Sequence, residues 1–243
     1  MTPIPLPRID LHDSSAPQHP PARRLALSES PVSIRAARSD DERGEVGALI
    51  QRRYAWRGYR CDPSPPKHMA LAAIDTASGL AIGTLGLRLD GPSGLGCDLS
   101  FPDIVSGLRA QGWSLSEFVG LAVEPGAPKL ALGALFHAAY LFATRVGRSD
   151  YLVMEVHPRH KATYIRGLGF APLSDERQCE RAQAPAILLG QSRAQLERRL
   201  GPLAGTWRTL GSPPGLYPYF FSPPEAESLC QRLFGPVPPE DSF

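Results

Sequence analysis

The sequence predicts an α/β fold in which helices flank a mixed sheet that contains a parallel pair of strands. Short apolar segments alternate with helix-length segments along most of the chain. Two of the short segments, 116–123 and 151–156, are largely apolar on both faces, which is typical of central strands covered by helices. The apolar segment 130–146 between them predicts a helical crossover, and such crossovers join parallel strands.

Composition narrows the classes of function. The chain has 243 residues, 42% of them hydrophobic, which suits one sizeable domain with extensions or two small ones. Its net charge is +2, and the basic residues are scattered without interleaved aromatic residues, so we expect no nucleic-acid partner. The four cysteines are far apart and form no CxxC pair, which argues against a zinc site and favours reduced thiols in a cytoplasmic protein. They are Cys61, Cys97, Cys179 and Cys230.

Hydropathy predicts neither a secretory signal nor a transmembrane segment. The start of the chain lacks a charged region followed by an apolar one. The longest uncharged apolar stretch, 130–144, contains His137 and is shorter than the roughly 18–20 residues that a spanning helix needs. A buried helix fits this stretch better.

Composition also divides the chain into three parts. Residues 1–30 are rich in proline and polar residues and cannot bury a core, so they predict a disordered arm. The folded core is expected over 31–190. Residues 191–243 predict a helical and aromatic extension that packs on this core.

Local signals place the remaining elements. Ser39 and Glu42 have the spacing of a capping box, so a helix should begin there and continue through Tyr54. Two apolar segments separated by a short glycine-containing turn predict a hairpin, and Pro102 predicts the start of a helix that ends before Gly112. The expected strands and helices not yet named are 32–36, 69–75, 80–89, 102–110, 162–167, 186–189, 192–200 and 224–234. A polar loop is expected over 56–67.

Two segments are candidates for chemistry. Residues 121–136 form a buried strand, a short loop and a helix start, and a helix start offers free amides to a phosphate or an oxyanion. An ordinary strand-to-helix turn would have the same pattern. The second segment, 155–170, combines Glu155, two histidines, basic residues and Tyr164 after a buried strand.

These segments resemble the core of the GNAT acyltransferase superfamily. The resemblance lies in Leu-Ala-Val-x-Pro at 121–125, the apolar helix, the second strand, and Tyr164 ahead of Gly-Phe at 169–170. More narrowly, His-Pro-Arg-His at 157–160 and Leu-Gly-Phe at 168–170 resemble motifs of the long-chain N-acyl amino acid synthases. In that family the first motif begins with Asn, and two aromatic residues usually stand where this chain has Thr163 and Tyr164. The resemblance covers 32–189 and implies a GNAT-like sheet with a splayed parallel strand pair.

The resemblance implies an N-acyltransferase that joins a long-chain fatty acyl group to the amine of an amino acid. Acetyl-CoA-dependent relatives bind a diphosphate with Arg/Gln-x-x-Gly-x-Gly/Ala, where this chain has Pro128, Ala131 and Gly133. Two of the three features are missing, so the implied donor is an acyl thioester on the phosphopantetheine of an acyl carrier protein. We expect no tightly bound cofactor.

Three residues are candidates for catalysis. Glu117 is the only carboxylate in its strand and could take a proton from the acceptor ammonium, unless it is a solvated strand-entry residue. His160 is an alternative base, or a residue that packs at a helix start. By resemblance, Tyr164 protonates the departing thiolate, and its alternative role is core packing.

Other residues are expected to bind substrates. Arg159 could pair with the carboxylate of the amino acid, because a guanidinium binds a carboxylate with two hydrogen bonds. Glu155 and His157 share a strand face and complete this set, although Glu155 could instead form an ion pair with an arginine such as Arg159. The candidate donor-binding residues are Leu121, Ala122, Val123, Lys129, Gly133 and Arg166.

Three other functions fit parts of the pattern. An acyl-homoserine lactone synthase would be expected to have an arginine three residues after Glu117, where this chain has Gly120. A non-catalytic lipid-binding module would keep the fold without the chemistry. A small-molecule N-acetyltransferase is disfavoured by the altered phosphate loop. Tyr217 and Phe220, in the aromatic segment 217–221, are candidates to cover an acyl tunnel or simply to dock on the core.

Overall fold

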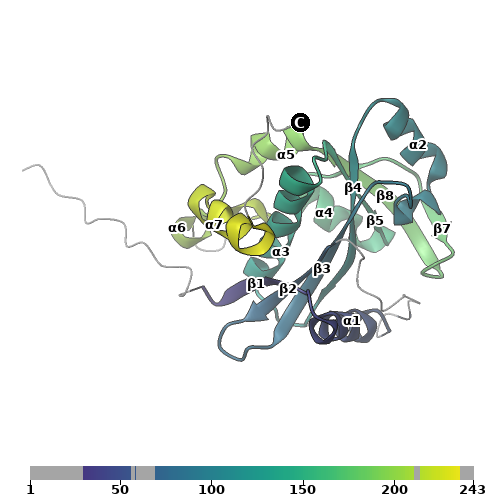
Figure 1. Ribbon diagram of the computed structural model, residues 1–243. Helices are drawn as coiled ribbons and strands as arrows, with labels where there is room; N and C mark the ends of the chain where they lie inside the picture. Colours follow the sequence, from purple (N-terminus) through teal and green to yellow (C-terminus); the bar gives the residue numbers. More distant parts are fainter. Residues whose placement is uncertain (1–29, 56–57, 59–68, 211–213, 236–243) are drawn as a thin grey trace, which may run out of the picture. The chain divides into compact units, whose positions relative to one another are not determined.

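An eight-stranded sheet forms the centre of the protein (Figure 1). The computed structural model describes residues 30–55, 58, 69–210 and 214–235, so the predicted arm up to residue 29 and the loop 56–67, apart from Gly58, lie outside the described residues. The strand order is β1-β2-β3-β4-β5-β8-β6, and β7 also pairs with β8. The strands are β1 Val32–Ala36, β2 Met69–Asp75, β3 Ala81–Leu89, β4 Leu115–Val123, β5 Tyr151–Val156, β6 Ala171–Pro172, β7 Arg177–Cys179 and β8 Ala184–Ser192.

Helices cover both faces of this sheet (Figure 1). They are α1 Asp40–Ala55, α2 Pro102–Ala110, α3 Lys129–Leu141, α4 Lys161–Leu168, α5 Arg193–Leu200, α6 Trp207–Leu210 and α7 Pro223–Phe234. Helix α3 shares the largest buried cluster with α5 and α7, whereas α1 and α2 pack in separate clusters on the opposite face. The fold class is therefore the predicted one, with β4 and β5 as a parallel pair.

The capping-box residues and the apolar sequence of 130–146 form the elements that were predicted from them, namely the start of α1 and the buried helix α3. Ser39 Oγ accepts a hydrogen bond from the Glu42 amide at 3.2 Å, and the Glu42 carboxylate accepts one from the Ser39 amide at 3.1 Å. This capping box starts α1. Eleven residues of α3 are buried, in agreement with its apolar sequence, and the helix continues as a π-helix over Phe142–Val146.

The short elements with no counterpart in the prediction include β6, β7, α6 and the 3-10 helix Tyr217–Tyr219. Strands of two or three residues are too short to show alternation, so their sequences carry no recognisable period. The 3-10 helix lies in a proline-containing segment whose aromatic residues could equally belong to a loop.

The aromatic segment after residue 214 docks on α3. The Phe221 amide donates a hydrogen bond to His137 Nδ1 at 2.9 Å, and the Tyr219 side chain lies against Gly133. A Cβ added at Gly133 would be 2.6 Å from Tyr219 Cβ, so this close approach needs a glycine. His137 is thus a hydrogen-bonded core residue, as its place in an apolar helix suggests.

Helix α7 also reaches the edge of the sheet. Arg232 Nη2 donates to the carbonyl of Ile34 on β1 at 3.5 Å. Arg38, just after β1, donates to the carbonyl of Leu233. None of the helices among the described residues is both long and apolar enough to cross a membrane.

Candidate active site

The parallel pairing of β4 and β5 stops before either strand ends. Register runs from Leu115 opposite Tyr151 to Phe118 opposite Met154, but β4 continues to Val123 and β5 to Val156. Beyond this point β4 contains an irregularity in its pairing with β3, where Gly120 has a φ of 60°. The two parallel strands therefore separate at the point where the sequence predicts a thioester site. The left-handed backbone at Gly120 also disfavours the arginine that a lactone synthase would have there.

Glu117 lies on β4, one residue before the last residue that pairs with β5. Its side chain faces the α2 side of the sheet. It is fully buried, and its Oε2 accepts a hydrogen bond from the Gly96 amide at 2.6 Å. Its Oε1 is buried without a hydrogen-bond partner among the described residues. Burial raises the pKa of Glu117 to about 7, although the Gly96 bond and two nearby arginines act in the opposite direction. The suggestion that Glu117 is a solvated residue at the strand entry is wrong.

Charged groups surround Glu117. Glu155, whose side chain is 7% exposed, forms an ion pair with Arg181 at 3.1 Å and accepts a hydrogen bond from Ser100 at 3.4 Å. Arg88 is directly opposite Glu117 in the β3–β4 register. The expected ion pair of Glu155 therefore exists, but its partner is Arg181 and not Arg159.

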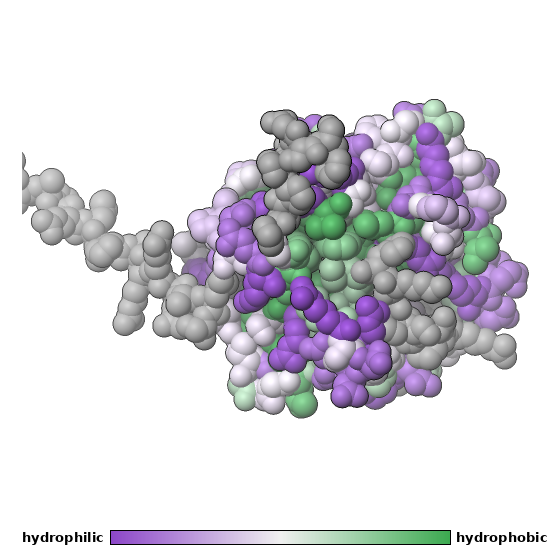
Figure 2. Space-filling view, in the orientation of Figure 1, coloured by the Kyte–Doolittle hydropathy of each residue, from purple (hydrophilic) through white to green (hydrophobic). Residues whose placement is uncertain are grey.

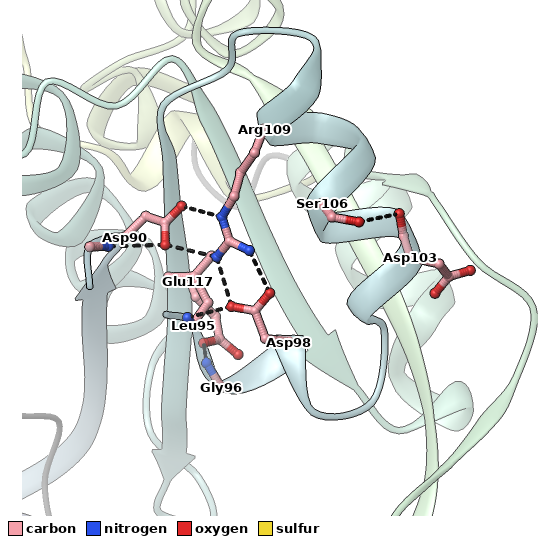
Figure 3. Close-up of polar contacts among 9 residues, drawn as sticks. Asp90, Leu95, Gly96, Asp98, Asp103, Ser106, Arg109 and Glu117 are labelled. Atoms are coloured by element: carbon pink, nitrogen blue, oxygen red, sulfur yellow. Dashed lines mark hydrogen bonds and ion pairs between the residues drawn. The ribbon is translucent and has the colours of Figure 1, made fainter. Parts of the chain in front are cut away.

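A clamp of two carboxylates on one arginine holds the loop that contains Gly96 (Figure 3). Arg109 on α2 donates to Asp90 at 2.7 and 2.8 Å and to Asp98 at 2.6 and 2.7 Å. Asp98 also accepts the Leu95 amide at 2.7 Å, next to the amide that Gly96 gives to Glu117. The hydrogen bonds from Arg109 lower the pKa of Asp98, so this carboxylate stays charged.

Tyr164 lies at the opposite side of the strand separation. Its ring meets that of Phe136 on α3 at 6.2 Å, and burial raises its pKa. Tyr54 on α1 raises that pKa further. Tyr164 is therefore protonated at neutral pH and able to donate a proton. Its contact with Phe136 places it on the α3 face of the sheet.

The motif at 157–160 forms a local cluster. His157 Nδ1 accepts the Arg159 amide at 3.2 Å and caps the 3-10 helix Pro158–His160. Burial lowers the pKa of His157. Arg159 is exposed, and its Nε donates to His160 Nε2 at 3.3 Å. These three residues lie together, and the hydrogen bond of Glu117 goes to Gly96 rather than to any of them.

The candidate donor residues occupy two regions. Leu121, Ala122 and Val123 lie on the end of β4 that pairs with β3 but no longer with β5, and Ala122 is buried. Lys129 is exposed at the start of α3, 6.0 Å from the centre of the Tyr219 ring, and Arg166 is exposed on α4. Gly133 lies further along α3, where it also packs against Tyr219.

No metal-binding group is present in the described part of the chain, where no three or more His, Cys, Asp or Glu side chains are arranged to hold an ion. The three cysteines within it are buried free thiols. They are Cys97, Cys179 and Cys230, and Cys61 lies outside the described residues.

Comparison with known proteins identifies the family. The family model described as N-acyl amino acid synthase FeeM matches residues 45–192, which is more than half of the chain. The chain belongs to this family. No curated protein sequence matches the FeeM-family chain.

The solved structure of FeeM agrees with this assignment at the level of the fold. The structure of FeeM, an N-acyl amino acid synthase from uncultured soil microbes, has a TM-score of 0.61 at 22% identity and covers 69% of this chain and 93% of its own. A putative N-acetyltransferase from Lactobacillus plantarum has a TM-score of 0.48 at 16% identity, covering 67% and 99%. The acyl-homoserine lactone synthase LasI has a TM-score of 0.45 at 16% identity, covering 68% and 94%.

The FeeM-family chain is thus an N-acyltransferase with a GNAT-like fold, as the sequence predicted. Sequence reasoning missed three residues of its charged site: Arg88, Gly96 and Arg181. Arg88 stands out as a charge in an apolar strand, but its position opposite Glu117 depends on a register across a 25-residue connection. Arg181 lies in the turn of the β7–β8 hairpin, which sequence reasoning did not predict.

Proposed function

We propose that this FeeM-family enzyme transfers a long-chain fatty acyl group from the phosphopantetheine thioester of an acyl carrier protein to the amine of a free amino acid. The observation that supports it most is the early end of the β4–β5 pairing, after Phe118 and Met154. A thioester arm needs such an opening between strands, with free backbone amides beside it. Buried Glu117 points to the α2 face of the sheet, and half-buried Tyr164 packs on the α3 face.

Glu117 serves as the base. The amino acid arrives as an ammonium and must lose a proton before its nitrogen can attack the thioester carbonyl. A carboxylate with a pKa of about 7 is partly ionised at neutral pH and holds a proton more strongly than an exposed one. Glu117 is fully buried. As the acceptor enters, its proton passes to Glu117 directly or through a water molecule. His160 is the alternative base.

The remaining groups act on the acyl transfer itself. Attack of the amine forms the C–N bond and places a negative charge on the former carbonyl oxygen, which amides at Leu121–Val123 stabilise. Collapse of this intermediate breaks the C–S bond. The phenol of Tyr164 gives its proton to the leaving thiolate, and the second proton that the nitrogen loses as the amide forms returns to the Tyr164 phenolate through water. The products are an N-acyl amino acid and a free thiol on the carrier, with one proton left on Glu117.

The start of α3 supports a carrier protein as donor. It has Pro128 and Ala131 where diphosphate-binding relatives have polar or glycine residues, and Tyr219 packs on Gly133. A phosphopantetheine arm has one phosphate and no diphosphate, and exposed Lys129 and Arg166 can attract it or an acidic carrier surface. Hydrophobic residues gathered in the middle of the face in Figure 2 offer apolar surface for the acyl chain.

The assay of this proposal combines purified enzyme with acyl carrier protein loaded with a long-chain acyl group, and with each of the twenty amino acids separately. Mass spectrometry should detect an N-acyl amino acid with the carrier and much less with the matching acyl-CoA. Glu117→Gln and Tyr164→Phe should each lower kcat by about 10²-fold or more, the range of general acid–base catalysis. Product from acyl-CoA but not from the acyl carrier protein would overturn the assignment of the carrier as donor. Full activity of both variants would overturn the catalytic roles of Glu117 and Tyr164.

A further inference from the structure

The charged site contains two arginines in different states. Arg181 is held by its ion pair with Glu155. Arg88 is only partly exposed, yet its guanidinium has no hydrogen bond or ion pair with any described residue. Partly buried charges usually have a partner, because removing a charge from water without one is costly. Arg88 therefore has free capacity to bind an anion.

The place of Arg88 beside Glu117 follows from the sheet. The two residues are cross-strand partners, so their side chains leave the sheet on the same face. Directly opposite residues have Cβ atoms about 4.5–5.5 Å apart, a separation that one small molecule can bridge. Arg88 is also close enough to lower the pKa of Glu117 without forming an ion pair with it.

Gly96 lets these charged groups converge. A Cβ added at this glycine would lie 2.5 Å from Arg181 Nη1, 3.2 Å from Arg88 Nη1 and 3.1 Å from Glu117 Oε2. Three charged groups thus surround one point above the glycine. Glu155 neutralises Arg181, so Arg88 remains to pair with a ligand.

We infer that Arg88 binds the α-carboxylate of the acceptor amino acid while the amine of the same molecule faces Glu117. This inference rests on the proposed function. An amino acid has its carboxylate and its amine on one carbon, and the cross-strand pair supplies an anion-binding group and a proton acceptor side by side. A guanidinium recognises a carboxylate with two parallel hydrogen bonds.

The assignment limits the class of acceptor. Amino acid esters and amides, and peptides joined through the carboxyl group, lack the charge that Arg88 binds and should be poor acceptors. It also differs from the expectation for Arg159, which is exposed and donates to His160. The two arginines can therefore be tested against each other.

The experiment compares Arg88→Gln, Arg88→Lys and the matched control Arg159→Gln in the full chain. The substrates are the L-amino acid that the wild type turns over fastest among the twenty, and the methyl ester of that amino acid. Arg88→Gln should raise the KM for the acid by about 10- to 100-fold, the worth of a hydrogen-bonded charge, and leave the KM for the ester nearly unchanged. The KM of Arg88→Lys for the acid should lie between those of the wild type and Arg88→Gln, because an ammonium keeps the charge but cannot form the paired hydrogen bonds. Arg159→Gln, the variant of the competing candidate, should leave the ratio of the KM values for the acid and the ester as it is in the wild type.

Two results would overturn the inference. One is an equal rise of the KM for acid and ester in Arg88→Gln, which would mean that Arg88 has a structural role. The other is a rise of the KM for the acid alone in Arg159→Gln. If the wild type makes no N-acyl product, the proposed function fails, and thermal shift with the twenty amino acids still tests Arg88. Stabilisation of the wild type by an amino acid, absent in Arg88→Gln and Arg88→Lys, supports the site, and equal shifts or none refute it.

Discussion

Glu117 is a carboxyl group whose charged form the surrounding protein disfavours. Its pKa in the folded state is about 7, whereas that of an unfolded glutamate is about 4.3. Between these values the folded chain binds a proton that the unfolded chain does not, so stability falls as pH rises through this window. Above pH 7 the ionised group costs on the order of 3 kcal/mol of folding free energy.

Replacing this carboxyl group should therefore stabilise the protein and inactivate it. In Glu117→Gln we expect the free energy of unfolding, relative to wild type, to increase more at pH 8 than at pH 5. Urea denaturation at both pH values measures this difference. Glu225→Gln is the control, because hydrogen bonds from Ser222 lower the pKa of Glu225 against its burial, so its removal should destabilise at pH 8. A gain for Glu117→Gln that does not depend on pH would contradict the role of ionisation.

At the scale of elements, the Arg109 clamp links α2 to the site. Arg109→Gln leaves Asp90 and Asp98 near each other without their common cation, and the loop that presents the Gly96 amide loses its anchor. We expect a loss of about 1–3 kcal/mol of stability. Because the Gly96 hydrogen bond lowers the pKa of Glu117, the acidic limb of the kcat/KM profile should also move to higher pH.

A second ion pair on the same helix provides the comparison. Arg177 binds Asp103 with two hydrogen bonds of 2.6 and 2.8 Å at the start of α2, away from Gly96. Asp103→Asn should leave the pH profile in place. If both variants shift the profile equally, the clamp has no specific effect on Glu117.

The contact of α3 with the aromatic segment gives a further prediction. Gly133→Ala brings a methyl group to within 2.6 Å of Tyr219 Cβ, so we expect a loss of about 1–3 kcal/mol from overpacking. Gly44 on α1 has open space around its Cα, and Gly44→Ala should instead stabilise by about 0.5–1 kcal/mol. Thermal unfolding of both variants measures the contrast, and a stable Gly133→Ala would mean that the segment can move away.

The elements and the site differed in how far the sequence could predict them. Cap residues and apolar periods predicted the longer strands and helices, since these signals are local. Glu117 and Glu155 were identified because a carboxylate is unusual in a buried strand. Their partners Arg88 and Arg181 were not, because the β3–β4 register and the β7–β8 hairpin are set by tertiary pairing that no local pattern encodes.

At the scale of the whole molecule, the residues after 200 complete the main core. Buried side chains of the later segments lie in the same cluster as α3 and β5. They are Leu216, Tyr217, Tyr219, Phe220, Ala226, Leu229, Cys230 and Leu233. The predicted division at 190 therefore describes a change in sequence character, and we propose that both parts unfold as one unit.

Removal of the later part tests this proposal. A chain that ends at Gly201 leaves one side of α3 uncovered, so we expect it to lose cooperative unfolding and fixed tertiary packing. Near- and far-ultraviolet circular dichroism should show one coincident transition for the full chain and none for the shortened one. A shortened chain that melts cooperatively at the original midpoint would identify the extension as an independent unit.

The contacts of α7 with the edge strand bear on how the chain is made. Ile34 in β1 and Arg232 are 198 positions apart, so a ribosome releases the first long before the second. Until α7 arrives, the outer edge of β1 stays open to other nascent chains with unpaired strands. Translation that stalls before Arg232 should consequently yield polypeptides that associate with one another, and a chaperone that shields strand edges would favour the finished enzyme.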